Sequence, residues 1–348
     1  MTLNALTRRG FIRERLTAQR LTITLAALAI VLMAVGLFSM AVGGEHVSFV
    51  DVIRVIGAEI TGRVAEVSPE QKIIIADIRF PRVLMALVVG AALSVAGSAY
   101  QALLRNPLAD PGILGISSGA ALGAISATIF AESLAISRPF AAFGGAVITI
   151  AIVYAFGQGR RSSGTERLIL AGVIINALLS SIVIFLVTSV AGARQRNVLS
   201  WLIGDLSGES RLLLPVAAFV VVGITTVYLN ARSLNLMMIG EQDALALGVE
   251  AKRVKIIVYL AASLLTGAAV AVSGAIGFVG LIIPHAVRLV GGSDNRLVVP
   301  ASALVGGVFL MLADTIARTV VAPRELNIGV ITSLVGAPIF VYLLRRTN

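Results

Sequence analysis

Long apolar runs separated by short polar breaks make up most of this chain. Most of the runs approach the roughly 20 residues that an α-helix needs to cross the hydrocarbon core of a bilayer. The pattern therefore predicts an all-α, polytopic membrane protein with about ten transmembrane helices. The expected helices cover about residues 21–42, 81–104, 112–130, 139–156, 168–191, 212–228, 256–272, 276–290, 298–319 and 327–344.

The stretch from Arg79 to Gly123 is the one around which the other segments are placed. Arg79 and Arg82 flank a Phe-Pro pair, and an apolar run of membrane length, rich in small residues, follows them. The run breaks at 106–107 and 110–111, where Asn-Pro and Asp-Pro pairs stand, and then restarts. Because a residue before proline avoids helical backbone angles, we expect one crossing, a tight turn and the start of a second crossing.

Composition agrees with a membrane protein. Of the 348 residues, 57% are hydrophobic and 13% are charged, whereas soluble domains carry about 25% charged residues. The spans leave no room for a soluble enzymatic domain, so residues 1–348 are expected to form one transmembrane domain. The absence of cysteine excludes disulfides and thiolate metal sites.

The net charge of +10 has two interpretations. It could indicate nucleic-acid binding, but with ten crossings the excess of Lys and Arg falls on the side that holds both termini. The positive-inside rule then places both termini in the cytoplasm and makes a nucleic-acid partner unnecessary.

Polar segments lie between the spans. Residues 1–20 are expected to be a cytoplasmic tail, and 43–78 a polar outer segment in which 46–60 forms a short surface helix. Residues 231–255 are too polar to cross a membrane and are expected on the cytoplasmic face. Within them, 241–247 has the pattern of a short helix between two glycines. Such a helix could be a handle for another protein or only a structural interfacial helix.

Two of the expected helices carry similar sequences. Gly90–Ser98 reads GAALSVAGS and Gly267–Ala275 reads GAAVAVSGA, and the two helices run in opposite directions in the ten-helix topology. Similar sequences in opposite orientations indicate an inverted repeat, from which many transporters are built. Chance similarity between Gly- and Ala-rich helices is the alternative.

Catalytic signatures are missing from the sequence. The three lysines, Lys72, Lys252 and Lys255, do not follow glycine, so the chain has no Walker A loop for binding ATP. It has no metalloprotease histidine pair, and His46 lies far from His285 in the sequence. His285 follows a proline, which favours a hydrogen-bonded histidine in a kinked helix over a metal ligand. Charges cluster at helix ends, so the energy for any transport is expected to enter from outside the chain.

Polar residues within or next to apolar helices need partners. Tyr100, Gln101, Asn106 and Asn176 could line a translocation path or simply bond to a neighbouring helix. A glycine series at 115, 119 and 123 permits close helix packing, within the chain or at a dimer seam.

Three arginines are expected on the outer face: Arg79, Arg82 and Arg318. They could form a solvated rim or a cationic docking ring for an acidic partner, because the guanidinium group binds carboxylates through two parallel hydrogen bonds.

Six signatures in this order make the chain resemble the permease subunits of type II ABC importers, the group that takes up ferric siderophores, haem and cobalamin. They span nearly the whole chain: RFPR (79–82), QALLRNPLADPGILG (101–115), GEQDALALG (240–248), GAIGFVGLIIPH (274–285), ADTIAR (313–318) and ELNIGVITSLVGAPIF (325–340). One departure is Asn327, where many members have proline after Glu-Leu.

The resemblance implies the inverted-repeat permease fold with ten helices, in a bacterial cytoplasmic membrane. It implies a second permease subunit, identical or not, two cytoplasmic ATPase subunits that carry ATP and Mg²⁺, and an extracytoplasmic substrate-binding protein. The second, fifth, eighth and tenth helices would line the path, and no cofactor is expected in this chain. The residues it assigns are, for ATPase coupling, Gly240, Glu241, Ala244, Leu247 and Gly248; for docking of the binding protein, Arg79, Arg82 and Arg318; and for a cytoplasmic gate, Ser162, Ser163 and Thr165.

We therefore expect a non-catalytic subunit that imports a bulky iron chelate, with a ferric siderophore preferred because the path offers no strong metal ligand. A secondary transporter or channel that needs no ATPase is the main alternative, and an assembly or sensor protein is a weaker one. The sparse midplane charges and the polar 231–255 segment argue against the secondary transporter.

Overall fold

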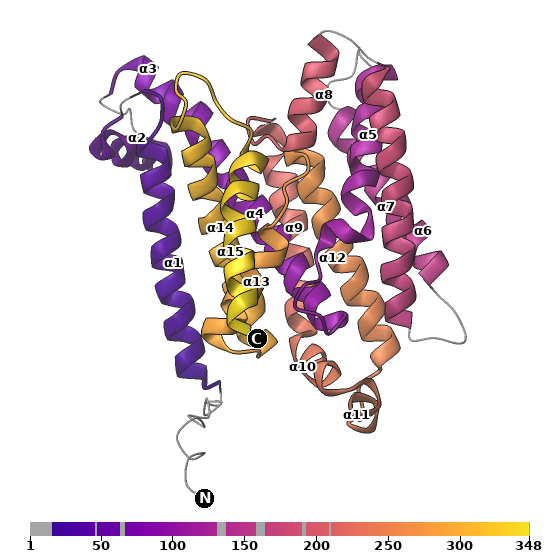
Figure 1. The fold of residues 1–348 in the computed structure, drawn as a ribbon. Coiled ribbons are helices and arrows are strands. Elements are labelled where there is room, and N and C mark those ends of the chain that lie inside the picture. The colour runs from indigo at the N-terminus through magenta and orange to yellow at the C-terminus, as the bar shows by residue number, and fades with distance from the viewer. Residues whose placement is uncertain are drawn as a thin grey trace, which may run out of the picture.

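The computed structural model describes residues 16–45, 47–62, 67–130, 137–157, 164–189, 193–208 and 210–347, and these residues form an all-helical bundle (Figure 1). Seven of their helical stretches are long and apolar enough to cross a membrane, and three shorter apolar helices accompany them, which confirms the predicted all-α membrane fold. The helices of the bundle are α1 (Ala18–Ala41), α4 (Phe80–Leu103), α5 (Ile116–Phe130), α6 (Ser137–Gly157), α7 (Gly164–Thr188), α9 (Leu213–Leu229), α12 (Ala251–Ser273), α13 (Val279–Gly291), α14 (Asn295–Thr319) and α15 (Ile328–Thr347).

Short helical elements lie at the two ends of the bundle or within its turns. The end with α2, α3 and α8 is called the outer end below, and the end with α10 and α11, where α1 begins and α15 ends, is called the inner end (Figure 1). The short elements are α2 (Phe49–Thr61), α3 (Pro69–Lys72), η1 (Ile73–Arg79), η2 (Pro111–Leu114), α8 (Ala193–Ile203), η3 (Ser210–Leu212), α10 (Ala231–Ile239) and α11 (Glu241–Ala246).

The prediction of a polar outer segment over 43–78 is wrong in its second half. The helical stretch that contains α4 begins at Pro69 and continues through the π-helical turn η1 into α4. Ser68 starts it with a capping box, since its side chain accepts from Gln71 N while the Gln71 side chain accepts from Ser68 N. Helices α8 and α10 were also not predicted, because their sequences are polar.

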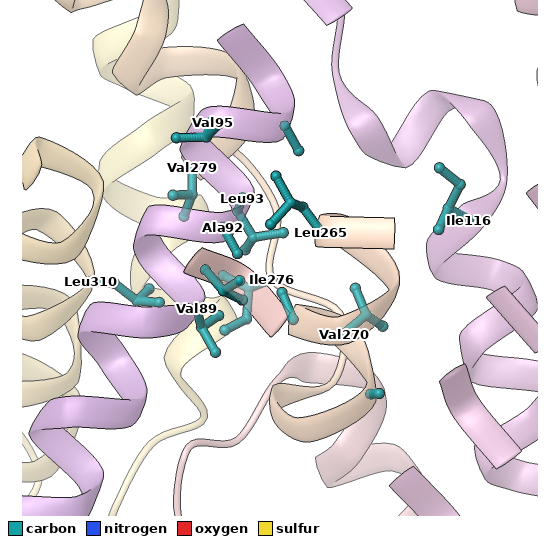
Figure 2. Close-up of a cluster of buried hydrophobic side chains, with 14 of the residues drawn as sticks. Val89, Ala92, Leu93, Val95, Ile116, Leu265, Val270, Ile276, Val279 and Leu310 are labelled. Carbon is teal, nitrogen blue, oxygen red and sulfur yellow. The ribbon is translucent and has the colours of Figure 1, made fainter. Parts of the chain in front are cut away.

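Helix α4 is the centre of the bundle. It packs against α12, α13 and α14, and 83% of its most apolar window is buried within the chain. Figure 2 shows Val89 and Leu93 of α4 gathered with Leu265, Val279 and Leu310 of the three neighbouring helices. Small residues make this possible, because they let helix backbones approach closely.

The contacts of α12 repeat those of α4. Helix α4 packs against α14 and α13, and α12 packs against α6 and α5, the corresponding helices of the other half. The matched glycines agree: a Cβ on Gly90 would lie 2.2 Å from Gly306 O, and one on Gly267 would lie 2.9 Å from the Ala146 Cβ. Because α4 and α12 run in opposite directions (Figure 1), the packing supports the predicted inverted repeat.

Two glycines approach each other closely where α13 crosses α4. Pro284 lacks the N–H that would bond the carbonyl of Gly280 within the helix. A Cβ on Gly97 would lie only 1.8 Å from that same Gly280 oxygen. Glycine is therefore required at position 97 by the close approach of the backbone of α13.

We predict that Gly97→Ala destabilises the chain by about 1–3 kcal/mol, because backbone atoms of α4 and α13 must separate. The measurement is thermal unfolding of the purified chain in detergent. Gly144→Ala in α6 is the matched control, since nothing lies within 4 Å of its new Cβ, and it should match or exceed the parent stability. Equal stability of the two variants would contradict the packing argument.

Candidate functional site

Helix α11 is the predicted short helix at the inner end, and the structure gives it bounds within one residue of the predicted 241–247. It is closed at its C-terminal end by Gly248 N donating to Leu245 O at 3.0 Å and Val249 N donating to Ala244 O at 2.9 Å. Gly248 has φ +83°, a left-handed conformation that glycine adopts without steric cost. No atom lies within 4 Å of a Cβ at this position, so the requirement for glycine is conformational.

The side chains of α11 divide between an attached face and a free face. Ala244 is fully buried, and Glu241 accepts from Lys255 Nζ of α12 at 2.6 Å. Leu245 and Leu247 are 55% and 64% exposed. A groove of about 530 Å³ runs beside them, lined by Leu245 and by residues 250–253, 256 and 257 at the start of α12. The coupling residues assigned by resemblance therefore form one protruding unit with apolar side chains outside the bundle.

Two of the three predicted docking arginines cap the C-terminus of α1. Arg79 donates to Met40 O at 2.8 Å, Ala41 O at 2.9 Å and Glu45 O at 2.6 Å. The last carbonyls of a helix have no hydrogen-bond donor within the helix and carry partial negative charge. A guanidinium group placed there supplies both the donors and the positive charge.

Arg318 reaches the same helix end from α14. Its Nη2 donates to Ser39 O at 3.0 Å and its Nη1 to Val42 O at 3.3 Å. The two guanidinium groups thus fix α1 to both α4 and α14 at the outer end.

Asp314 connects these arginines to the surface. Its carboxylate accepts from Arg318 Nε and from Arg82 Nε, each at 2.9 Å, and Arg82 Nη1 donates to the half-exposed Glu325 at 2.7 Å. The structure brings Arg79, Arg82 and Arg318 together at the outer end. The expectation of an exposed ring is wrong for Arg79 and Arg318, which are buried, because each has partners inside the chain.

The residues predicted for the path lie apart. Tyr100 and Gln101 are buried; the Tyr100 hydroxyl bonds to Ser263 of α12, and Gln101 Nε2 donates to the Leu281 carbonyl at 3.0 Å. They therefore present no surface to a path between two chains in this conformation.

Two more predicted path residues have local partners. Asn106 is exposed in the turn after α4 and accepts from Leu108 N at 2.9 Å. Asn176 of α7 is hydrogen-bonded to Ser118 of α5. The gate residues Ser162 and Ser163 lie outside the described residues, and for Thr165 only the backbone is described, in the first turn of α7.

His285 and Asn327 differ from their expectations. The His285 side chain is buried, and its Nε2 has no hydrogen-bond partner in the described part of the chain, so the expected hydrogen-bonded histidine is not found at that atom. Asn327 Nδ2 donates to the Ser200 carbonyl at 2.7 Å and to the Gly204 carbonyl at 3.3 Å. Proline at this position could not make these bonds. Asn327, which departs from the family motif, therefore attaches the end of α8 to the start of α15.

The sequence did not single out Asn235, Arg288 or Asn295, which share a polar cluster at the inner end. Asn and Arg are common near helix ends, and nothing in their spacing shows that they meet. Arg288, in the last turn of α13, was the strongest available signal.

The bundle, its inverted packing and its protruding inner helix define the class: a polytopic membrane permease. A family model described as the FecCD transport family matches residues 31–346. The chain therefore belongs to the FecCD transport family, which confirms the resemblance to permease subunits of ABC importers.

Relatives have names of the same kind. The cobalamin import system permease protein BtuC of Halobacterium salinarum is 45% identical, with 79% of this chain and 74% of the relative covered. The hemin transport system permease protein HmuU of Yersinia pestis is 43% identical (78% and 82% covered). The probable siderophore transport system permease protein YfiZ of Bacillus subtilis is 40% identical (79% and 84% covered).

A solved structure has the same fold. It is described as an inward-facing conformation of a metal-chelate type ABC transporter, and it superimposes with a TM-score of 0.82 at 30% identity. The alignment covers 93% of this chain and 99% of that one. The agreement over nearly the whole chain confirms the permease fold.

We predict that Asp314→Asn destabilises the chain by about 3–5 kcal/mol, because it leaves the buried charge of Arg318 without its counter-ion. Loss of the same carboxylate charge in Glu325→Gln should cost about 0–1 kcal/mol, since that ion pair is half-exposed. Thermal unfolding in detergent measures both. Similar losses of stability in the two variants would show that Asp314 does not hold Arg82 and Arg318 in place.

Proposed function

We propose that this chain is the non-catalytic, membrane-spanning permease of an ATP-driven importer that moves a bulky metal chelate into the cytoplasm. The observation that carries the proposal is α11, a short helix at the inner end with Leu245 and Leu247 exposed beside a groove. Exposed apolar side chains on a protruding element suit a partner protein. Membership of the FecCD transport family supports an ATPase subunit as that partner.

Each assigned coupling residue has a distinct part in this proposal. Gly248 provides the left-handed turn that ends α11, and Ala244 packs its inner face. Glu241 holds the helix to Lys255 of α12. Leu247 then contacts the ATPase. ATP and Mg²⁺ bind to that partner, and α11 transmits its conformational change to the permease.

The same proposal orients the chain. The inner end holds Lys252, Arg253, Lys255 and Arg296 near helix ends, and the positive-inside rule places such an end in the cytoplasm. The membrane is then a bacterial cytoplasmic membrane, with both termini on its inner side.

A second permease subunit, identical or not, would complete the translocation path. Of the four helices expected to line it, α7 and α15 have extended exposed apolar faces, whereas α4 is enclosed. The path therefore lies along α7 and α15, between the two subunits. An extracytoplasmic binding protein would deliver the substrate at the outer end.

The substrate class follows from the relatives, which are named for cobalamin, hemin and siderophore transport at 45%, 43% and 40% identity. These identities differ too little to choose among the three. We propose a metal chelate of this size range and take a ferric siderophore as the first candidate.

Reconstituted uptake tests the function. The chain is placed in proteoliposomes with its cognate ATPase subunits and binding protein, and uptake of ferrichrome, haemin and cyanocobalamin is measured with and without ATP. We predict ATP-dependent uptake of one of the three and its loss in Leu247→Glu, because a buried unpaired carboxylate at the ATPase contact is costly.

Val290→Glu is the matched control. Val290 is 88% exposed near the inner end but lies outside α11. This variant should retain uptake and co-purify with the ATPase subunits. Uptake that needs no ATP, or a Leu247→Glu variant with normal uptake, would contradict the proposed function.

We also propose that the outer end receives the binding protein through Arg82, the arginine of the cluster with an exposed partner. A double change of Arg79 and Arg82 to Glu would not test this, because Arg79 caps α1 and its loss would disturb the fold. Glu325→Gln is the more specific test, because it frees one hydrogen-bond donor of Arg82 and leaves the Arg82–Asp314 pair in place.

We predict that Glu325→Gln strengthens binding of the binding protein several-fold in low salt, because an acidic partner no longer competes with Glu325 for Arg82. Affinity is measured by surface plasmon resonance on the detergent-solubilised complex at two salt concentrations. Unchanged affinity at both would exclude Arg82 as a docking residue, and an unchanged unfolding temperature is the control for the fold.

A further inference from the structure

A partly buried polar cluster lies at the inner end, on the helix α10 that precedes α11 and on its neighbours. It consists of Asn235 of α10, Arg288 of α13, and Asp294 and Asn295 at the start of α14, and it reaches the Ser98 carbonyl of α4. Helix α10 ends at Ile239, one residue before the cap of α11. We call this set of side chains the inner cluster.

The two asparagines form the centre of the inner cluster. Asn235 Oδ1 accepts from both Asn295 N and Asn295 Nδ2, each at 2.8 Å, and Asn235 Nδ2 donates to Asp294 Oδ1 at 2.7 Å. Asn295 is fully buried. The amide of Asn235 is therefore used as donor and acceptor at once, which fixes α10 to the turn between α13 and α14.

Arg288 extends the connection to the centre of the bundle. Its Nη2 donates to Asn295 Oδ1 at 3.0 Å and to the Ser98 carbonyl at 3.1 Å, and its Nη1 donates to the Ser293 carbonyl at 3.3 Å. An unbroken series of hydrogen bonds thus runs from α10 through the start of α14 and the end of α13 to α4.

Asp294 is the acidic residue of the inner cluster. Asp294 caps α14 by accepting from Arg296 N at 3.0 Å and also pairs with the Arg296 side chain. Burial alone would raise the pKa of Asp294, but hydrogen bonds from Arg296 and Asn235 outweigh it and lower the pKa. The carboxylate therefore stays ionised at neutral pH and keeps its acceptor capacity.

We infer that Asn235, Asn295 and Arg288 are positioning residues that join α11 to α4 and α13, so that these elements move as one unit when the ATPase displaces α11. The inference rests on the proposed function. Each broken bond would leave a buried polar group unsatisfied, which is costly in a low-dielectric interior.

The other attachment of α11 is weaker. It consists of the Glu241–Lys255 pair, in which the side chains are 41% and 27% exposed, and the packing of Ala244. Exposed ion pairs contribute little. The connection through α10 and the inner cluster is therefore the one that ties α11 to α4, α13 and α14 by several hydrogen bonds.

Distance measurements by pulsed electron paramagnetic resonance test this. The chain has no cysteine, so cysteines introduced at Gln242 of α11 and Leu108 after α4 give the only labelled pair. Both positions are exposed, and the turn that holds Leu108 is bonded to the end of α4 through Asn106 N and Gln101 O. The labelled chain is assembled with its cognate ATPase subunits, and the distance distribution is recorded without nucleotide and with ATP and Mg²⁺.

The parent complex should give one narrow distribution that nucleotide does not change. Asn235→Ala and Asn295→Ala should each add a second, nucleotide-dependent distance, and the double variant should resemble either single variant because both act through one connection. Asn230→Ala is the matched control: it removes an amide hydrogen bond to Thr226 O at the start of α10, outside the inner cluster, and should behave as the parent.

A nucleotide-dependent shift in the parent, or Asn235 and Asn295 variants with the parent distribution, would overturn the inference. If Asn235 and Asn295 served only local stability, their variants would keep the parent distance distribution and have a lowered unfolding temperature. Failure of the parent chain to assemble with any ATPase pair would instead refute the proposed function, and the inference with it.

Discussion

Backbone carbonyls that lipid cannot solvate set the main constraint on this structure. A bilayer offers no water to an unpaired carbonyl, so each interruption of a helix at membrane depth needs a donor from elsewhere in the chain. Arg79 and Arg318 supply donors to the end of α1, and Arg288 supplies one to Ser98 in α4. Asn327 does the same for the end of α8. These polar side chains, scattered through an apolar sequence, hold the helix ends together.

Where no donor is available, the chain uses close packing. The carbonyl of Gly280, left free by Pro284, lies against the backbone of Gly97, where any side chain would collide with it. The central position of α4 depends on such contacts, because a helix enclosed by α12, α13 and α14 must bring its backbone near each of them. Small residues in α4 therefore follow from its place in the fold.

The sequence predicted the parts of the fold that depend on local properties. Span length and apolarity located the helices of the bundle, and two glycines located α11 between them. It did not predict that residues 69–80 of the Pro69–Leu103 stretch are helical, because Asp77 and Arg79 interrupt the apolar pattern there. Hydrogen-bond partners that are distant in the sequence could not be predicted either. Arg79 looks like a surface arginine until α1, 38 or 39 residues earlier, provides the carbonyls that bury it.

The path residues show the same limit. Tyr100 and Gln101 are polar groups on an apolar helix, and the sequence alone left open whether they face a path or a neighbouring helix. The choice depends on which face of α4 is covered, and the structure covers the part of α4 that holds Tyr100 and Gln101. Exposed apolar faces on α7 and α15 carry no comparable sequence signal, because a face toward lipid and a face toward a second subunit are equally apolar.

The two polar clusters act on the same helices from opposite ends. At the outer end Arg318, Asp314 and Arg82 connect α1, α14 and α4, and at the inner end Arg288 and Asn295 connect α13, α14 and α4. Separating any of these helices would break buried hydrogen bonds to charged groups, worth about 1.5–3 kcal/mol each. Among the described residues, no ion pair joins α5, α6 or α7 to the helices α1, α4, α13 and α14. A hydrogen bond between the hydroxyl groups of Tyr100 and Ser263 links α4 to α12. The least costly relative movement within the chain is therefore between these two sets of helices, with the α4–α12 contact as the boundary.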